Sequence, residues 1–356
     1  MSPKGGSETS PLLPGGGPLS PSSSSSSSSE EPNYFPHLPP YKNPTSGFLS
    51  LLPSSWIPYA QLMRLDRPAG LYAFYFPYLI GLAYAACITP SDSIPSVKTL
   101  FILSAILLPF NILFRGATCT WNDTLDKKFD QQVARCRHRP VARGAVSVPK
   151  AHLWTLTQTL ACAPIIWFGF PGETIPHAVI GLGLFLVYAY MKRVTYYPQA
   201  VLGVAFAWAI FFSVAAIPGA QEKVYEPGTV ALAGSVVLWA FIYDTIYAHQ
   251  DIADDVQAGV KSSALALQNW TKVICSGLTI IQGGMLVLTG LWSGFGWGYY
   301  LGTVGGVLGT TGWYVWRVDL KDPESCGKAF RTQFWTVGGG YVVGFVVEYG
   351  RKVGWW

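Results

Sequence analysis

The chain has few charged residues. Of its 356 residues, 12% are Asp, Glu, Lys or Arg, whereas an ordinary soluble domain carries about 25%. The hydrophobic fraction is 50%, and apolar stretches of roughly 20 residues recur along the sequence. This composition excludes an ordinary soluble domain and indicates a polytopic, all-helical membrane protein. The net charge of +5 is too modest to indicate a nucleic-acid partner.

Paired cysteines and spaced histidines are also missing. The six cysteines are scattered with no CxxC pair, and the five histidines show no metal-ligand spacing. Most of the cysteines fall in or beside apolar stretches, where a free thiol packs as a small hydrophobic side chain. The pattern therefore favours buried cysteines over disulfides or a zinc site.

The N-terminal region has no arginine before Arg64 and no apolar core after a basic start. It therefore fits neither a mitochondrial transit peptide, which needs an Arg-rich amphipathic helix, nor a secretory signal. Residues 1–50 are rich in Ser, Pro and Gly, and such a segment cannot bury enough apolar area to offset its chain entropy. We predict a disordered tail over 1–50 and a short amphipathic lead-in at the membrane interface over 51–67.

Nine membrane spans are predicted within residues 68–356, each built from a long apolar stretch. The short fourth span and the glycine-rich ninth span have the weakest signals. The predicted spans are 68–88, 99–121, 151–170, 176–191, 199–218, 229–247, 272–293, 297–316 and 332–349.

Lysine and arginine gather in alternate loops. The loops after the second, fourth, sixth and eighth spans carry most of them, and the opposite loops hold little beyond Lys98 and Lys223. By the positive-inside rule, the basic loops and the N-terminus are cytoplasmic and the C-terminus lies on the far side.

An acidic cluster, Asp123, Asp126 and Asp130, follows the second span. The three residues are spaced three and four apart, so on one helix they share a face, with Asn122 beside it. Neighbouring carboxylates repel one another, and a hard cation such as Mg²⁺ relieves the repulsion. A solvated helix end with ordinary acidic residues is the alternative explanation for this cluster alone.

A second acidic cluster, Asp244, Asp251 and Asp255, follows the sixth span on the same predicted side of the membrane. Together the two segments hold a large share of the chain's 19 acidic residues. Two carboxylate clusters at the ends of two spans indicate one shared, polynuclear metal site. A transporter is a remote alternative, because transporter sites lie near the membrane midplane between repeated halves, and these clusters lie at span ends.

A diphosphate with bound Mg²⁺ accounts for the acidic clusters and the basic loops together. The carboxylates would hold the metal, the metal would bridge phosphate oxygens, and nearby cations would neutralise the remaining charge. The same cations also serve topology, so we expect only some of them to contact phosphate. The candidates are Arg135, Arg139, Lys192, Arg193 and Lys261, with Arg67 as a residue that could instead anchor its helix at the interface.

Arg115 lies inside the second predicted span, together with Asn111. A charged residue inside a membrane is costly, so we expect Arg115 to face the bundle interior and to mark a functional pathway. Snorkelling of the side chain to the interface is the alternative.

The motifs resemble those of the UbiA superfamily of intramembrane prenyltransferases. The family motif NDxxDxxxD is matched from Asn122 to Asp130 without departure. The second motif, from Tyr243 to Ser262, is similar to that of the para-hydroxybenzoate polyprenyltransferase branch. One departure lies in the basic stretch after the first motif, where Cys136 follows Arg135 and that branch carries Thr. The resemblance covers about residues 56–350.

The resemblance implies nine helices around a central cavity that opens laterally to lipid. It implies that the six aspartates of the two clusters bind Mg²⁺-diphosphate and are catalytic, with Asn122 in support. Arg67, Arg115 and the basic candidates are predicted to bind substrate from their charge and position. It also implies an aromatic acceptor, which the residues alone do not indicate. The expected reaction is transfer of an isoprenoid chain, farnesyl in our prediction, to a ring carbon of a phenolic acid. No protein partner is expected.

Two roles remain open within that branch. One is meroterpenoid biosynthesis on a polyketide-derived phenolic acid, in the endoplasmic reticulum or another endomembrane. The other is ubiquinone biosynthesis on para-hydroxybenzoate in the mitochondrial inner membrane. The Arg-free, Ser/Pro-rich tail favours the endomembrane role.

Overall fold

The structure, a computed structural model, describes residues 34–355, in which every regular element is a helix. Residues 1–33 of the predicted tail lie outside the described part. The chain forms two units, Met1–Tyr34 and Phe35–Trp356, and the helices of the described residues lie in the second. The long elements are α2 (Ala69–Ile88), α3 (Val97–Leu125), α5 (Val148–Gly169), α6 (Thr174–Val194), α7 (Pro198–Ala215), α8 (Pro227–Ala248), α11 (Thr271–Ser293), α13 (Gly306–Arg317) and α14 (Pro323–Val353).

Short helices connect the long ones. They are η1 (Phe48–Leu51), α1 (Ile57–Leu62), α4 (Lys127–Asp130), η2 (Gln221–Lys223), η3 (His249–Asp251), α9 (Ile252–Ala258), α10 (Ser263–Leu267), η4 (Gln268–Trp270), α12 (Trp297–Tyr299) and the π-helix η5 (Tyr300–Gly305).

Each predicted span falls on a helix. Within residues 34–355, six helical stretches are long and apolar enough to cross a membrane, so the protein is a multi-pass membrane protein. The six belong to α2, α3, α6, α7, α8 and α11. The predicted count of nine stays a prediction, because α5, α14 and the α12–η5–α13 segment are not among them.

Local sequence signals set the helix ends. α3 begins after Ser96, whose hydroxyl accepts a hydrogen bond from the Thr99 N–H at 3.1 Å, and α14 begins after Asp322, whose carboxylate accepts from the next N–H groups. α11 ends at Ser293, and the next residue, Gly294, adopts a left-handed conformation that only glycine takes without strain.

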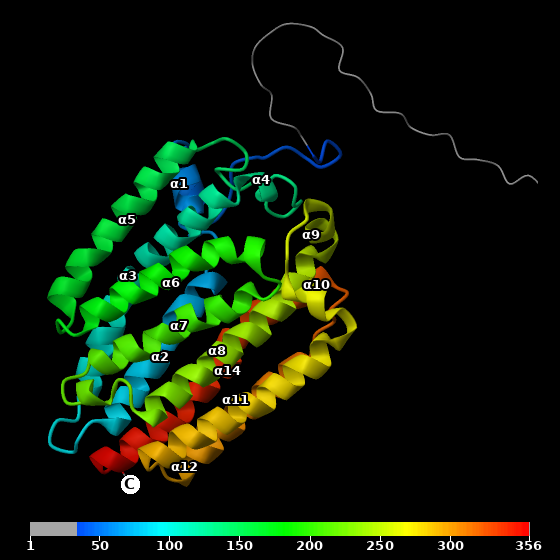
Figure 1. Ribbon diagram of the computed structural model, residues 1–356. Helices are drawn as coiled ribbons and strands as arrows, with labels where there is room; N and C mark the ends of the chain where they lie inside the picture. The colour runs from blue at the N-terminus through cyan, green and yellow to red at the C-terminus, as the bar shows by residue number, and fades with distance from the viewer. Residues whose placement is uncertain (1–33, 356) are drawn as a thin grey trace, which may run out of the picture. The chain divides into compact units, whose positions relative to one another are not determined.

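The packing of the long helices brings several of the short connecting helices to one end of the bundle. α2 packs against α7 and α14, α8 packs against α7 and α11, and α5 covers α3. The short helices α4, α9 and α10 gather at one end of the bundle, and the C-terminus and α12 lie at the other (Figure 1). The segments that carry the two acidic motifs therefore meet at the same end.

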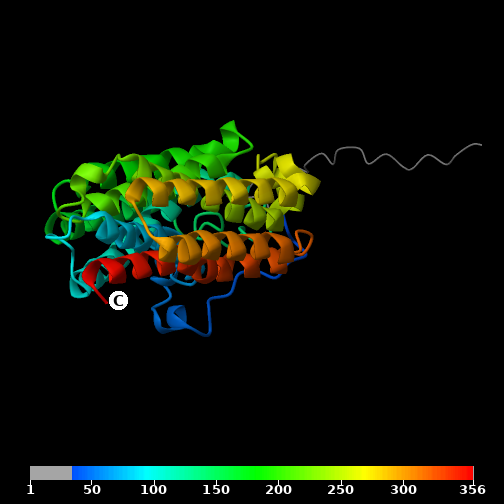
Figure 2. The same ribbon diagram turned by 90° about the horizontal axis from the view of Figure 1, so that it is seen from below.

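Glycine explains the weak signal of the ninth predicted span. α14 runs beside the segment formed by η5 and α13 (Figure 2). A Cβ at Gly302 would lie 2.8 Å from the backbone of Gly344, and one at Gly340 would lie 3.1 Å from the backbone of Gly306. The glycines that lower the apolar signal are what allow these two backbones to touch.

Candidate active site

Both acidic motifs border one cavity of about 740 Å³ at this end of the bundle. Asp123 contributes from the last turn of α3 and Asp244 from the last turns of α8. The end of η3 contributes Asp251, and α9 contributes Asp255. Four of the six predicted carboxylates, together with Asn122, therefore line a common space.

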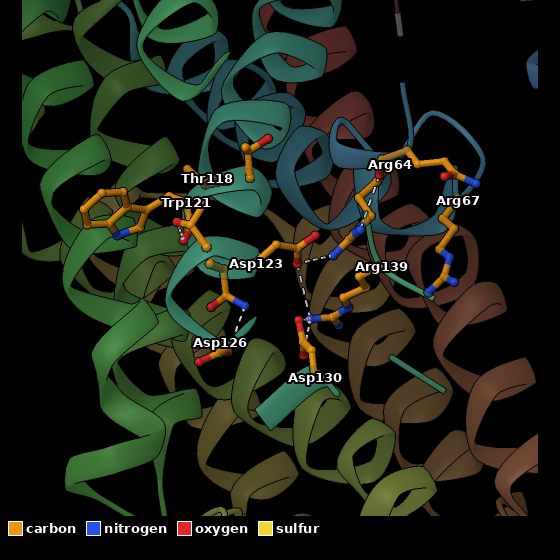
Figure 3. Close-up of polar contacts among 12 residues, drawn as sticks. Arg64, Arg67, Thr118, Trp121, Asp123, Asp126, Asp130 and Arg139 are labelled. Carbon is orange, nitrogen blue, oxygen red and sulfur yellow. Dashed lines mark hydrogen bonds and ion pairs between the residues drawn. The ribbon is translucent and has the colours of Figure 1, made fainter. Parts of the chain in front are cut away.

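Asp123 is the centre of the first motif. Its Oδ1 accepts hydrogen bonds from Arg64 Nη2 at 2.5 Å and from Arg139 Nη1 at 3.3 Å (Figure 3). The side chain is fully buried, and its Oδ2 has no hydrogen-bond partner among the described residues. A buried carboxylate oxygen of this kind needs a further cation or donor.

The prediction that the first cluster forms one helix face is wrong for Asp126. α3 ends at Leu125, and Asp126 caps it before the separate helix α4 begins. Its carboxylate turns away to Arg193 Nη2, at 3.0 Å, and to Asn122 Nδ2, at 3.1 Å. Neither Asp126 nor Asp130 is among the residues that line the cavity.

Asp130 is tied to Asp123 through a shared arginine. Both Asp130 oxygens lie 2.9 Å from Arg139 Nη1 (Figure 3). Burial raises the pKa of the Asp130 carboxyl to about 6, although the Arg139 guanidinium pulls that pKa down. Burial alone would lower the pKa of Arg139, but Asp130 and Asp123 raise it well above its ordinary value. The site therefore contains a buried, tightly coupled ion group.

The second motif is held in the same way. Arg135 donates from Nε to Asp251 Oδ1 at 2.9 Å and from Nη2 to Oδ2 at 2.5 Å, which is a bidentate pair. Its Nη1 donates to the hydroxyl of Tyr247 at 3.3 Å. Asp244 differs, because it has no ion pair within residues 34–355. The positive charges that influence it, Lys192 and Arg135, are paired with Asp126 and Asp251 instead.

The predicted basic residues differ in whether they line the cavity. Lys192 and Lys261 line the cavity; Lys192 Nζ lies 3.8 Å from Asp126 Oδ2, and Lys261 Nζ donates to the Val194 carbonyl at 3.3 Å. Arg67, Arg135 and Arg139 also line it. Arg193 is not among the lining residues; it donates to Asp126 and to the Leu125 carbonyl.

Arg115 faces the bundle interior, as the sequence predicted. It is 6% exposed, which excludes the snorkelling alternative. Its guanidinium donates to the carbonyls of Arg64, at 3.1 Å, and Arg67, at 2.7 Å. These two hydrogen bonds hold the turn before α2 in place. Arg115 also lines the cavity itself.

Arg64 belongs to the site but is missing from the predicted site residues. It adopts a φ of 57°, a left-handed conformation that is strained for a residue with a side chain. The Arg115 hydrogen bond to its carbonyl holds this turn and directs the Arg64 side chain to Asp123. The sequence did indicate that Arg64 could face the cavity, because it stands just before the first predicted span beside Asp66 and Arg67.

The remaining wall of the cavity is apolar and aromatic. Phe74, Phe185 and Phe206 all line it, from α2, α6 and α7. Phe74 stacks on Phe185 with ring centroids 4.8 Å apart, and Phe206 meets both rings edge-on at 5.0 and 5.3 Å. Behind them, Phe114 contacts Phe74 and Phe185. The cavity thus joins a charged end to an aromatic floor, formed by Phe74, Phe185 and Phe206.

The residues fit Mg²⁺ only in company with a ligand. Within residues 34–355, no group of three or more His, Cys, Asp or Glu side chains is arranged to hold a metal ion by itself. The predicted polynuclear site of six carboxylates therefore stays a prediction. Mg²⁺ needs only one or two carboxylates when phosphate and water complete its shell, and the unpartnered Asp123 Oδ2 offers such a ligand.

Comparison with known proteins places this site in a family. The sequence matches the UbiA prenyltransferase family over residues 74–338. The chain belongs to the UbiA prenyltransferase family. It is 35% identical over 328 residues to prenyltransferase ascA of Acremonium egyptiacum, covering 88% of this chain and 91% of that protein. It is 37% identical to 4-hydroxybenzoate geranyltransferase 1 of Lithospermum erythrorhizon, covering 80% and 88%.

Solved UbiA structures share the fold. A UbiA homologue from Archaeoglobus fulgidus, solved with GPP and Mg²⁺, superposes with a TM-score of 0.60 at 15% identity, covering 82% of this chain and 99% of that one. The helical architecture is therefore UbiA-like, and the chain is a prenyltransferase. The resemblance noted from the sequence motifs is confirmed.

Proposed function

We propose that this UbiA prenyltransferase moves an isoprenoid chain, farnesyl in length, from its diphosphate to a ring carbon of a phenolic acid. The acceptor we favour is polyketide-derived, which makes the reaction a step of meroterpenoid biosynthesis in an endomembrane. The observation that carries the proposal is the cavity itself, because one wall is charged and the other is aromatic. An isoprenoid diphosphate likewise has a charged diphosphate head, which suits the charged wall, and an apolar hydrocarbon tail, which suits the aromatic wall.

The charged end supports diphosphate binding. Arg139, Arg135, Lys192 and Lys261 border the same space as Asp123. Guanidinium and ammonium groups neutralise phosphate oxygens, and the planar arginines can do so with two hydrogen bonds. Departure of diphosphate from an allylic carbon builds negative charge on the leaving oxygen, and fixed cations at that point lower the barrier.

A bound Mg²⁺ would supply further neutralisation of the phosphate oxygens. Asp123 and the cavity-lining aspartates of the second motif are the side chains that would hold it.

The aromatic floor supports a short donor. Phe74, Phe185 and Phe206 close the apolar end of the cavity, and Phe114 packs behind them. A volume of about 740 Å³ lies in the range of pockets that hold one drug-sized ligand. A farnesyl chain and one phenolic ring suit this space better than a long polyprenyl chain.

The mechanism follows from these two ends. The cations and carboxylates orient the diphosphate, so that the allylic C–O bond ionises beside the aromatic wall, where ring faces stabilise a carbocation. A ring carbon of the phenolic acceptor, activated by its hydroxyl group, attacks the cation. Loss of the ring proton restores aromaticity, and the dry cavity keeps water from capturing the cation.

The alternative acceptor is para-hydroxybenzoate, with the enzyme in the mitochondrial inner membrane. The 37% identity to a plant protein named 4-hydroxybenzoate geranyltransferase favours this acceptor. The 35% identity to a fungal prenyltransferase, matched over more of both chains, favours the first proposal.

A competition assay separates the two. Microsomes from cells that express the chain receive farnesyl diphosphate and Mg²⁺, with para-hydroxybenzoate and an orsellinic-type acid offered together. Product on the orsellinic-type acid alone supports the meroterpenoid role. Product on para-hydroxybenzoate, with turnover that rises for longer donors, would assign the enzyme to ubiquinone biosynthesis and overturn the proposal.

A further inference from the structure

A second, smaller cavity of about 310 Å³ borders the site, and we call it the vestibule. Tyr41, Lys42 and His138 line the vestibule but not the larger cavity. Residues that line both cavities form a common wall between them. They are Arg64, Asp66, Arg67 and Arg139.

The vestibule is built by specific contacts. Residues 35–47 pass over the loop between α4 and α5, where the Pro39 carbonyl accepts a hydrogen bond from Arg137 Nη2 at 2.9 Å. The guanidinium of Arg143 lies 3.7 Å from the ring centroid of Tyr41 and donates to Gln61 Oε1 at 2.9 Å. The Tyr41 hydroxyl in turn accepts from Gln61 Nε2 at 3.0 Å. These contacts join the N-terminal segment, α1 and the basic loop into one wall.

The charge of the vestibule is suited to an anion. Lys42, Arg64, Arg67 and Arg139 surround it, and Asp66 is its one acidic lining residue. Among the described residues, the buried Nε of Arg139 has no hydrogen-bond acceptor. Arg67 is half exposed, and its ion pair with Asp66 is long, at 3.5 Å. Phosphate oxygens are the acceptors that such guanidinium groups prefer.

We propose that the vestibule binds inorganic diphosphate, the second product of the transfer, as it leaves the site. This inference rests on the proposed function. In the proposed reaction, diphosphate is released at the charged end, and the prenylated product occupies the aromatic end that Phe74, Phe185 and Phe206 close. Arg64, Arg67 and Arg139 border both spaces, so the same cations face a small anion on either side of the common wall.

Product inhibition tests the proposal. Lys42→Glu places a carboxylate in the vestibule at an exposed position outside the larger cavity. Lys150→Glu is the control, since it makes the same charge change at an exposed position that lines neither cavity. We expect Lys42→Glu to raise the inhibition constant of added inorganic diphosphate about five-fold. The KM for farnesyl diphosphate and the behaviour of Lys150→Glu should stay as in the wild type.

Three results would overturn the inference. An unchanged inhibition constant would show that Lys42 does not meet the product, and an equal rise in donor KM would show that it acts on the donor's own site. An effect on turnover that appears only in vesicles containing phosphatidylglycerol would assign the vestibule to a lipid head group. Calorimetric titration of wild type and Lys42→Glu with inorganic diphosphate measures the vestibule without turnover, so its outcome is separate from failure of the proposed function.

Discussion

Asp244 is the carboxylate whose role can be measured without disturbing the fold. It lines the cavity and forms no ion pair with Lys192 or Arg135 in the described structure. The change Asp244→Asn keeps the shape of the side chain and removes its charge. We expect transfer to fall by about 100-fold, the loss typical of one electrostatic contact to a transition state. Because no ion pair is broken, the free energy of unfolding should change by much less than the roughly 3–5 kcal/mol lost when a buried pair is broken.

Asp123 gives a contrasting case. Its removal would leave Arg64 buried without its partner and would weaken the hold on Arg139. Breaking a buried pair in this way costs about 3–5 kcal/mol. Loss of activity in Asp123→Ala would therefore mix catalysis with stability, and Asp244→Asn avoids that ambiguity.

The assay pairs two readouts on purified, detergent-solubilised protein. Prenyl transfer from farnesyl diphosphate is followed by mass spectrometry of the product, and unfolding is followed by intrinsic fluorescence on heating. Asp254→Asn is the matched control, because Asp254 does not line the cavity and accepts a hydrogen bond from the Ala134 N–H at 2.9 Å, which an amide oxygen can also accept. Near-normal turnover in Asp244→Asn, or an equal loss in Asp254→Asn, would refute the reasoning.

Further predictions concern the ion group, the floor and the metal. Arg139→Gln should lower the free energy of unfolding by about 3–5 kcal/mol, seen in thermal unfolding, because Asp123 and Asp130 then lie buried without their shared cation; unchanged unfolding would contradict the buried ion group. Phe185→Ala should raise turnover of geranylgeranyl relative to farnesyl diphosphate, whereas Phe345→Ala, a core change away from the cavity lining, should not; equal shifts in both variants would reject the floor as a length limit. Chelation of divalent cations should stop transfer and added Mg²⁺ should restore it, and full activity in the chelator would exclude the metal from the reaction.

Structural features that depend on a single segment of the chain could be predicted from the sequence. Every predicted span lies on a helix, because long apolar runs bounded by Pro, Ser and Gly dictate helices locally. Arg115 was predicted to face the interior from the cost of its charge alone, and it does. The common location of the two acidic motifs followed from counting spans and loop charges, and four of the six carboxylates do meet at one cavity.

Features of the site that depend on contacts between distant segments could not be predicted from the sequence. Asp126 was expected beside Asp123, but the helix ends at Leu125 and Arg193, from α6, draws the carboxylate away. Arg64 reaches Asp123 only through a turn with positive φ, which no local propensity favours. The aromatic floor draws its phenylalanines from three helices, so no spacing in the sequence could indicate it.

The pairing of carboxylates with arginines has a consequence for how the site binds its ligands. Asp123 and Asp130 share Arg139, and Asp251 is held by Arg135. A cation entering alone would meet these guanidinium groups, and a diphosphate entering alone would meet the carboxylates, so each by itself gains little. A diphosphate that arrives with its cation brings both signs of charge and can satisfy both sets of side chains. The residue types in the motifs thus predict the ligand pair, and the pairings within the fold explain why neither ligand alone is expected to bind well in the larger cavity.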